Sequence, residues 1–294
     1  MNSSKFRGTG VAIVTPFDNK KQVDFPSLKK IVNYVNKFVD YIVVLGTTGE
    51  NPVLSQDEKI KVIKSVIEYN NGKVPVIAGI GGYDTSALIA GYKKYCIKGV
   101  DAVLSVTPYY NKPNQQGLYE HYKMISETTP LPVILYNVPG RTGVNMLAET
   151  TLKIAGDFKN IIAVKEASGN MEQIMTIIKN KSKNFLVISG DDAITLPLIA
   201  AGADGVISVT ANALPQKVSQ MVKLAAKNQI NEARLIHYKI IDFTAMMFKE
   251  GSPAGVKAAL ASLNLCKNVL RLPLVPVSEN HFKTIAEKTK ELTT

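Results

Sequence analysis

The sequence predicts a (β/α)8 barrel of the α/β class, followed by a C-terminal helical appendage. Two observations predict this fold. Short apolar runs alternate with longer amphipathic stretches from residue 11 to about residue 210, which is the pattern of repeated βα units around a parallel sheet. With 294 residues, 46% of them hydrophobic, the chain can also bury the core that such a barrel needs.

The candidate strands are rich in β-branched residues and end in glycine, proline or polar residues, as buried parallel strands do. They are Val11–Phe17, Tyr41–Gly46, Val74–Ile80, Ala102–Tyr109, Pro132–Val138, Ile161–Ala167, Phe185–Asp192 and Gly205–Thr210. Eight strands that alternate with helices match the order of a closed barrel.

Each candidate strand is followed by a stretch with apolar residues at helical spacing. These stretches are Phe25–Phe38, Gln56–Tyr69, Thr85–Ile97, Gly117–Glu127, Leu147–Ala155, Met171–Ile178, Ala193–Ala200 and Pro215–Ala226. A doubly wound open sheet is the main alternative. The first strand, however, is not followed by a glycine-rich dinucleotide turn with an acidic partner, so the barrel is preferred.

After residue 231 the alternation stops, and only helical patterns follow. They cover Ala233–Phe248, Pro253–Leu263 and Glu279–Leu292. A Gly-Ser-Pro break and the proline-rich segment 271–278 separate them. We therefore expect a catalytic barrel domain over residues 1–230 and a helical domain over residues 231–294.

The composition argues against several classes of function. The formal charge is +11, but only four of the 35 basic residues are arginines, and the lysines lie mainly on polar faces of expected helices. No apolar run approaches the roughly 20 residues of a membrane span, and the start lacks the apolar stretch of a signal peptide. We expect a cytoplasmic protein that binds neither nucleic acid nor membrane.

Cysteine and histidine usage gives no support for a metal site. Cys96 and Cys266 are far apart, and the three histidines are equally scattered, with no pair at ligand spacing. We expect reduced, buried thiols and no metal.

In a parallel barrel the active site lies at the C-terminal ends of the strands, so polar residues that end apolar runs are the candidates. Lys165 follows Ile-Ile-Ala-Val in the sixth run. A lysine pointing into the barrel would be partly desolvated, which disfavours its charged form and supplies the neutral amine that a Schiff base requires. The alternative is a lysine that leaves the strand and extends to water.

Two further candidates lie at the end of the fifth run. Tyr136 suits a proton relay beside a Schiff base, although a tyrosine in a strand is more often a packing residue. Arg141 lies in a Pro-Gly-Arg-Thr-Gly loop and suits bidentate binding of a carboxylate. A surface arginine is the alternative.

Two more loops have residues suited to a site. The sequence GTTGE (46–50) offers two hydroxyls and several backbone N–H groups for a small anion, or else forms a turn in which a threonine caps the next helix. The sequence TPYYNKP (107–113) holds two tyrosines between prolines, which suits the rim of a site or a subunit interface.

Together, GTTGE, TPYYNKP, YNVPGRTG, VKEASGN and SGDD, in this order and spacing, resemble the dihydrodipicolinate synthase branch of the N-acetylneuraminate lyase superfamily. The resemblance covers essentially the whole chain. It implies that Lys165 forms a covalent Schiff base with pyruvate, without another cofactor, and that the resulting enamine attacks L-aspartate 4-semialdehyde. The product would be 4-hydroxy-tetrahydrodipicolinate, an intermediate towards diaminopimelate and lysine.

The resemblance also implies roles for single residues. Tyr136, Thr47 and Tyr110 match the family's proton-relay triad, with Tyr110 expected from the neighbouring subunit. The least complete unit would then be a homodimer, and the family is usually a homotetramer built as a dimer of dimers.

Four more residues would contact the substrates. Thr48 would bind the pyruvate carboxylate, Arg141 would bind the carboxylate of the semialdehyde, and the backbone around Gly190 and Ile207 would line the Schiff-base pocket.

One part of the sequence departs from the family pattern. Lysine-inhibited relatives have histidine, asparagine and glutamate in an allosteric pocket where this chain has Gln56, Lys59, Tyr83 and Ala87. Without an acidic partner for the ligand's ammonium, weak or absent inhibition by lysine is expected.

Two alternative functions remain at this point. One is another pyruvate-dependent aldolase, acting on a keto-deoxy sugar acid or 4-hydroxy-2-oxoglutarate, although Arg141 favours the semialdehyde. The other is a binding protein that senses a keto acid or an amino acid.

Overall fold

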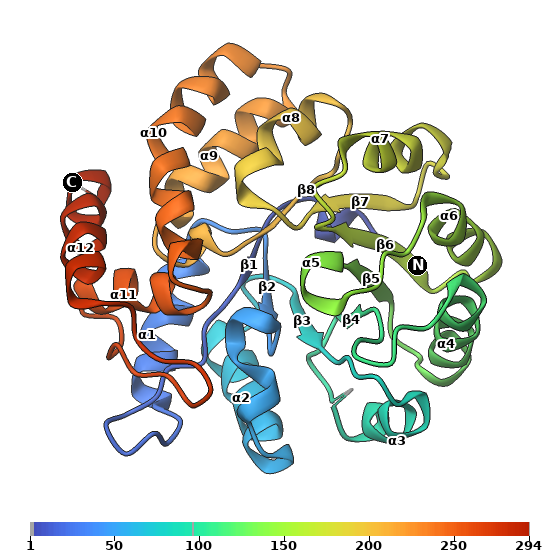
Figure 1. The fold of residues 1–294 in the computed structure, drawn as a ribbon, viewed down its shortest axis with the longest axis horizontal. Helices are drawn as coiled ribbons and strands as arrows, with labels where there is room; N and C mark the ends of the chain where they lie inside the picture. Colours follow the sequence, from blue (N-terminus) through green and yellow to red (C-terminus); the bar gives the residue numbers. More distant parts are fainter. Residues whose placement is uncertain (1–2, 96, 294) are drawn as a thin grey trace.

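The computed structural model describes residues 3–95 and 97–293 and has a central barrel surrounded by helices (Figure 1). Parallel strands pair in sequence order, and β1 pairs with β8 to close the sheet. The strands are β1 (Gly8–Ala12), β2 (Tyr41–Val44), β3 (Val76–Gly79), β4 (Ala102–Val106), β5 (Val133–Asn137), β6 (Ile161–Glu166), β7 (Leu186–Ser189) and β8 (Gly205–Ser208). The predicted (β/α)8 class is confirmed.

Helices follow the strands and cover the outside of the barrel. They are α1 (Phe25–Val35), α2 (Gln56–Asn70), α3 (Thr85–Tyr95), α4 (Gln115–Thr128), α5 (Pro139–Thr142), α6 (Ala148–Asp157), α7 (Met171–Asn180), α8 (Thr195–Ala200) and α9 (Pro215–Ala226). Short 3-10 helices are η1 (Ser4–Phe6), η2 (Thr47–Gly49), η3 (Asn51–Val53), η4 (Asp192–Ile194) and η5 (Thr210–Asn212). The cysteine prediction is met at Cys266, a free, buried thiol, whereas Cys96 lies outside the described residues.

The first strand was predicted wrongly. The prediction was Val11–Phe17, but β1 spans Gly8–Ala12, because the glycines that weaken its apolar pattern are needed for close packing. A Cβ on Gly10 would lie 2.1 Å from the Tyr41 ring. Beyond Ala12 the chain leaves the sheet before Pro16, which lacks a backbone N–H for a sheet hydrogen bond.

The interior of the barrel and the layer under the helices are separate cores, because side chains on each strand alternate between the two faces. On β6 this alternation is interrupted by a bulge: Val133 pairs with Ile161, but Ile134 pairs with Ala163. The extra residue shifts the rest of the strand by one position. Lys165 consequently shares the inner face with Tyr136, its partner in the register.

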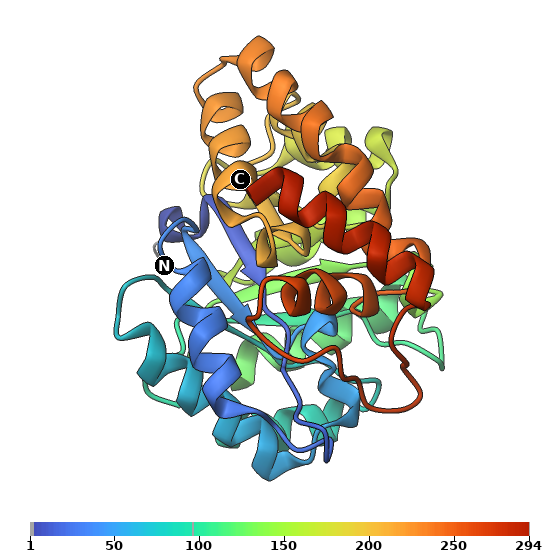
Figure 2. The ribbon, with the colours of Figure 1, turned by 90° about the vertical axis from the view of Figure 1, so that its left-hand side faces the viewer.

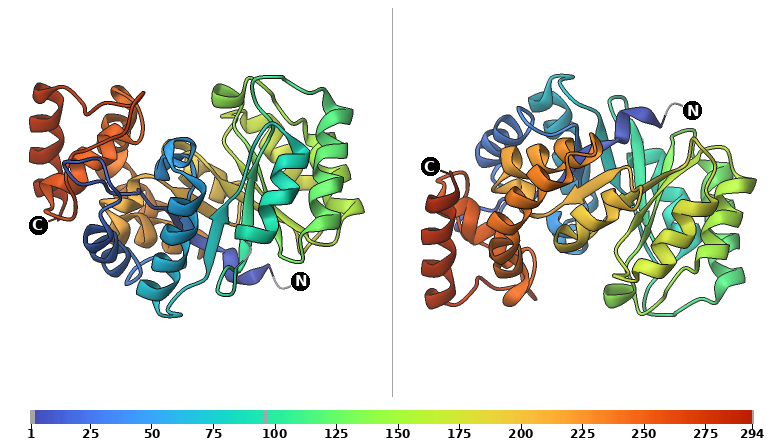
Figure 3. Two further views of the ribbon diagram at one scale, coloured as in Figure 1. Left: turned by 90° about the horizontal axis from the view of Figure 1, so that it is seen from below. Right: turned by 90° about the horizontal axis from the view of Figure 1, so that it is seen from above.

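Three helices follow the eighth βα unit: α10 (Ile230–Lys249), α11 (Ala254–Ser262) and α12 (Glu279–Thr293). α10 packs on α9, and α11 lies against α12, as Figure 2 shows. Figure 3 shows α11 and α12 at one end of the molecule, with α4 and α6 at the other. This is the predicted appendage, and the domain boundary at residue 230 stays a prediction. No helix in the described part of the chain is long and apolar enough to cross a membrane.

Candidate active site

A cavity of about 540 Å³ opens at the C-terminal ends of the strands, where a barrel of this kind carries its site. Six of the eight residues selected from the sequence lie in its wall: Thr47, Thr48, Tyr136, Arg141, Lys165 and Gly190. They come from four different strand ends, so the fold gathers residues that are up to 143 positions apart, from Thr47 to Gly190.

Among the residues that the structure describes, Lys165 is the only lysine in the wall of this cavity, and 6% of its surface is exposed. Its Nζ atom lies 4.2 Å from the centre of the Tyr136 ring. Among the described residues, no carboxylate lies within ion-pair distance of this amine. The amine therefore lies in the cavity wall without a salt bridge to any described carboxylate, and it is available to react with a ligand.

Gly190 leaves the space that the Lys165 side chain requires. A Cβ at this position would lie 3.0 Å from Cε of Lys165 and 2.7 Å from Cβ of Ala167. The Gly190 N–H donates to the Glu166 carbonyl at 2.7 Å, so the β6 and β7 ends are joined at the same point. Any larger residue here would displace the lysine or the strand end.

Glu166, which follows Lys165 in the sequence, points to the outer face of the barrel and holds the strand ends together. Its buried carboxylate accepts hydrogen bonds from Asn137 Nδ2 at 3.1 and 3.2 Å, from Gln173 Nε2 at 3.1 Å and from the Ser168 N–H at 2.8 Å. Burial raises the pKa of Glu166, against these hydrogen bonds. Because Asn137 follows Tyr136, this network fixes the two neighbouring site residues on adjacent strands.

The turn after β2 brings the two threonines to the cavity. Thr47 is exposed and Thr48 is buried, and both belong to η2. The Thr15 hydroxyl donates to the Gly49 carbonyl at 2.7 Å, and Asn51 Nδ2 donates to the Leu45 carbonyl at 2.8 Å. The turn is thus held at both ends by side chains from its surroundings.

Arg141 is exposed on α5, a short helix that the sequence did not predict. Proline at the first position and Gly143 at φ 71° delimit this helix. Among the described residues Arg141 has no carboxylate partner, so its guanidinium is available to an anionic ligand.

A second cavity of about 360 Å³ shares Thr47, Tyr136 and Arg141 with the first. Lys59 and Tyr109 contribute to its wall, and burial lowers the pKa of Lys59. Of the four residues that the sequence suggested for an altered effector pocket (Gln56, Lys59, Tyr83 and Ala87), only Lys59 lines this cavity.

Two predicted residues do not line the main cavity. Tyr110 is 88% exposed with φ 70°, whereas its neighbour Tyr109 packs edge-on against Tyr83 at 5.3 Å. Ile207 is 1% exposed within the inner core, and Val209 forms the wall at the end of β8 instead.

The wall also contains residues to which the sequence gave no role, and three of those described have polar or aromatic side chains. Asp191 belongs to the SGDD sequence but was not given a role, and Phe248 and Ser252 come from the appendage. No local pattern marks the last two, because only the packing of α10 on the barrel brings them to the cavity. Asp192, which follows Asp191, is half-buried and accepts hydrogen bonds from Ser208 Oγ and the Val209 N–H, and desolvation raises its pKa.

The arrangement defines a class of enzyme. A buried, unpaired amine can attack a carbonyl carbon, the adjacent phenol can transfer protons, and the arginine and threonines suit carboxylate groups. These are the parts of a Schiff-base aldolase acting on carboxylated carbonyl compounds. Within the described residues, no group of three His, Cys, Asp or Glu side chains is placed to bind a metal ion.

Comparison with known proteins agrees with this class. Residues 5–292 match the dihydrodipicolinate synthetase family, and the chain belongs to it. A 4-hydroxy-tetrahydrodipicolinate synthase of Flavobacterium psychrophilum is 52% identical over 288 residues, 98% of each chain.

Solved structures agree over the same length. The chloride-inhibited dihydrodipicolinate synthase of Acinetobacter baumannii, complexed with pyruvate, is 40% identical, with a TM-score of 0.94 over 98% of this chain and 99% of that one. A structure described as a monomeric dihydrodipicolinate synthase variant is 41% identical, with a TM-score of 0.96 over 99% and 98% of the two chains.

Proposed function

We propose that the chain condenses pyruvate with L-aspartate 4-semialdehyde to give 4-hydroxy-tetrahydrodipicolinate, in the pathway to diaminopimelate and lysine. The single observation that supports it most is the Lys165 amine, which is buried in the main cavity with no carboxylate partner among the described residues. Such an amine forms a Schiff base with a keto acid and requires no external cofactor.

In the proposed reaction, Lys165 attacks the keto carbon of pyruvate, and water leaves as the iminium forms. The iminium then loses a methyl proton to give an enamine, whose carbon attacks the aldehyde carbon of the semialdehyde. The amino group of the semialdehyde next attacks the iminium carbon, closes the ring and releases Lys165. One water is therefore lost for each product formed.

Tyr136 is proposed to carry protons during these steps, because its ring lies against the Lys165 amine. Thr47, in the wall of the same cavity, is proposed to pass the proton on, and Thr48 to bind the pyruvate carboxylate. Arg141 is proposed to bind the carboxylate of the semialdehyde, since its planar fork has no carboxylate partner among the described residues.

Tyr110 is proposed to complete the relay in a neighbouring subunit. Its side chain is largely exposed and does not line the cavity of its own chain, whereas its loop neighbour Tyr109 packs on Tyr83. An exposed Tyr110 that acts in a neighbouring subunit requires an oligomer, and we propose a homotetramer formed as a dimer of dimers. We also propose a cytoplasmic location. Sedimentation of the wild type and of Tyr110→Arg, with activity measured on the same samples, tests the assembly.

Weak inhibition by lysine is also proposed. Lys59 contributes a cation to the second cavity, where it would repel the ammonium groups of lysine. A titration with lysine that inhibits strongly at millimolar concentration would contradict this.

The reaction is tested by trapping and by turnover. Borohydride reduction in the presence of pyruvate should add one pyruvate-derived group, which peptide mapping should locate at Lys165. Condensation should then be faster with the semialdehyde than cleavage of a keto-deoxy sugar acid or 4-hydroxy-2-oxoglutarate. Absence of an adduct on folded wild-type protein would reject the proposal.

A further inference from the structure

The turn that carries Thr47 and Thr48 is fastened from outside the barrel. Glu50, the last residue of GTTGE, has a completely buried side chain. Its Oε1 atom accepts a hydrogen bond from Nζ of Lys257, a residue of α11 in the appendage, whose side chain is also completely buried. The two residues are 207 positions apart in sequence.

Lys257 has an environment that holds its amine in one place. Its Nζ atom lies 4.2 Å from the centre of the Phe17 ring and also donates to the Val269 carbonyl at 2.9 Å. Burial lowers the pKa of Lys257, and the Glu50 carboxylate acts in the opposite direction. A buried charge without its partner is strongly destabilising, so each member of this pair depends on the other.

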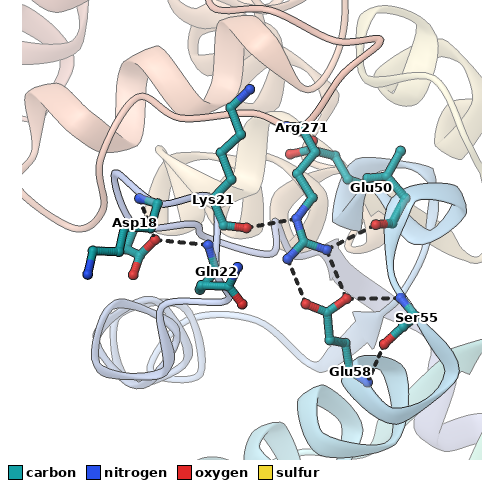
Figure 4. Close-up of polar contacts among 9 residues, drawn as sticks. Asp18, Lys21, Gln22, Glu50, Ser55, Glu58 and Arg271 are labelled. Atoms are coloured by element: carbon teal, nitrogen blue, oxygen red, sulfur yellow. Dashed lines mark hydrogen bonds and ion pairs between the residues drawn. The ribbon is translucent and has the colours of Figure 1, made fainter.

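The other oxygen of Glu50 is also held by the C-terminal segment, through the Arg271 N–H at 3.1 Å. Figure 4 shows the Arg271 side chain beside it, directed at Glu58 of α2. The guanidinium donates to both Glu58 oxygens, at 2.8 and 2.6 Å, and to the Lys21 carbonyl at 2.9 Å. Two separate ion pairs therefore join the C-terminal segment to this part of the barrel, and only the Lys257–Glu50 pair reaches the turn itself.

The backbone of the turn needs such support. Leu45 and Glu50, on either side of the two threonines, adopt φ angles of 59° and 52°, in the left-handed region that residues with a Cβ disfavour. Strained conformations of this kind persist only where the surroundings hold them. At Glu50 these surroundings are Lys257 and the Arg271 N–H, both from the C-terminal segment.

We infer that Lys257 is a positioning residue for the reaction: through Glu50 it sets the turn on which Thr47 and Thr48 face the Lys165 cavity. The inference rests on the roles proposed above for the two threonines. It predicts that removal of the Lys257–Glu50 ion pair lowers kcat/KM by more than the accompanying loss of stability explains.

The double variant Glu50→Gln/Lys257→Met tests this, because it removes both charges and leaves neither buried alone. We expect a folded protein that still forms the pyruvate adduct at Lys165 when pyruvate is saturating. Its kcat/KM for pyruvate should fall about 10- to 100-fold, since small displacements of positioned groups have effects of this size. Glu50→Asp, which keeps the charge but shortens the side chain, should show a loss in the same direction.

The matched control is Glu58→Gln, which removes the neighbouring ion pair but keeps both groups that bind the Glu50 carboxylate, Lys257 and the Arg271 N–H. It should lower the melting temperature without changing kcat/KM. The inference is rejected if the double variant, or Glu50→Asp where the double variant does not fold, has the kcat/KM of the wild type. It is also rejected if Glu58→Gln reduces kcat/KM equally at equal loss of stability.

These outcomes differ from a failure of the proposed function. In that case the wild type would give no adduct, or Thr47→Val and Thr48→Val would be as active as the wild type. If those variants lose activity and the double variant does not, only the positioning role of Lys257 fails.

Discussion

Two regions of the molecule each bury a lysine, and they use it differently. At the mouth of the barrel Lys165 is 6% exposed, and at the contact with the appendage Lys257 is fully buried. Both amines lie 4.2 Å from the centre of an aromatic ring, Tyr136 in one region and Phe17 in the other. Lys257 is paired with Glu50, whereas Lys165 has no carboxylate partner among the described residues.

The comparison separates a reactive lysine from a structural one. An aromatic ring lies against the amine in both regions, so the ring does not distinguish them. A carboxylate partner favours the charged amine, which has no lone pair for attack on a carbonyl. Whether a buried lysine can react with a carbonyl compound is therefore decided by its carboxylate partner and by its access to a cavity, and not by burial alone.

The distinction between the two lysines requires that Lys165, and not Lys257, reacts with pyruvate. Lys165→Met should lower kcat by about 10³-fold or more, because the nucleophile is lost, and should abolish borohydride trapping of pyruvate. Mass spectrometry after peptide mapping checks both. Trapping at Lys257, in the wild type or in this variant, would contradict the distinction.

The ring beside Lys165 should contribute to catalysis through its hydroxyl. Tyr136→Phe keeps the aromatic face but loses the proton donor, so kcat should fall about 10²-fold while the pyruvate adduct still forms. Steady-state kinetics and trapping on the same preparation measure this. An unchanged kcat would mean that the ring serves only to pack the lysine.

Arg141, for which the described residues include no carboxylate partner, should act on the second substrate. Arg141→Lys keeps the charge but loses the bidentate fork, so KM for the semialdehyde should rise by about tenfold, with trapping of pyruvate unchanged. The control is the KM for pyruvate under the same conditions. An equal rise in both values would show that Arg141 does not discriminate between the substrates.

The stability that the contact with the appendage contributes should depend on pH. Hydrogen bonds from Arg271 hold the pKa of the Glu58 carboxyl at about 2, below the ordinary 4.5. A lowered carboxyl pKa stabilises the fold above pH 4.5, and this contribution is lost as the pH falls towards 2. Because the pair is partly solvated, the effect should be about 1 kcal/mol.

Glu58→Gln, which keeps the cap of α2, should remove this pH-dependent part. Urea denaturation at pH 6 and pH 3 should show a difference from the wild type that shrinks at the lower pH. If the variant differs from the wild type by the same free energy of unfolding at pH 6 and at pH 3, the ion pair is not the cause of the difference.

Much of the fold followed from the residues themselves. Alternation of apolar runs and helical stretches predicted the barrel, and the residues that end those runs included six that line the cavity. Strand ends in a closed parallel barrel meet at one rim, so a list of strand ends is already a list of neighbours. The first strand was missed because its glycines, needed for packing on Tyr41, weaken the apolar signal.

The tertiary structure decided what lies beyond local pattern. Whether Lys165 or Glu166 faces the interior depends on the bulge at β6, which exists only in the pairing of two strands. The pairing of Glu50 with Lys257 joins residues 207 positions apart. The sequence by itself determined the fold class and the candidate residues, since these depend on periodicity and residue type. Orientation and charge pairing depend on which segments meet, and only the folded chain sets that.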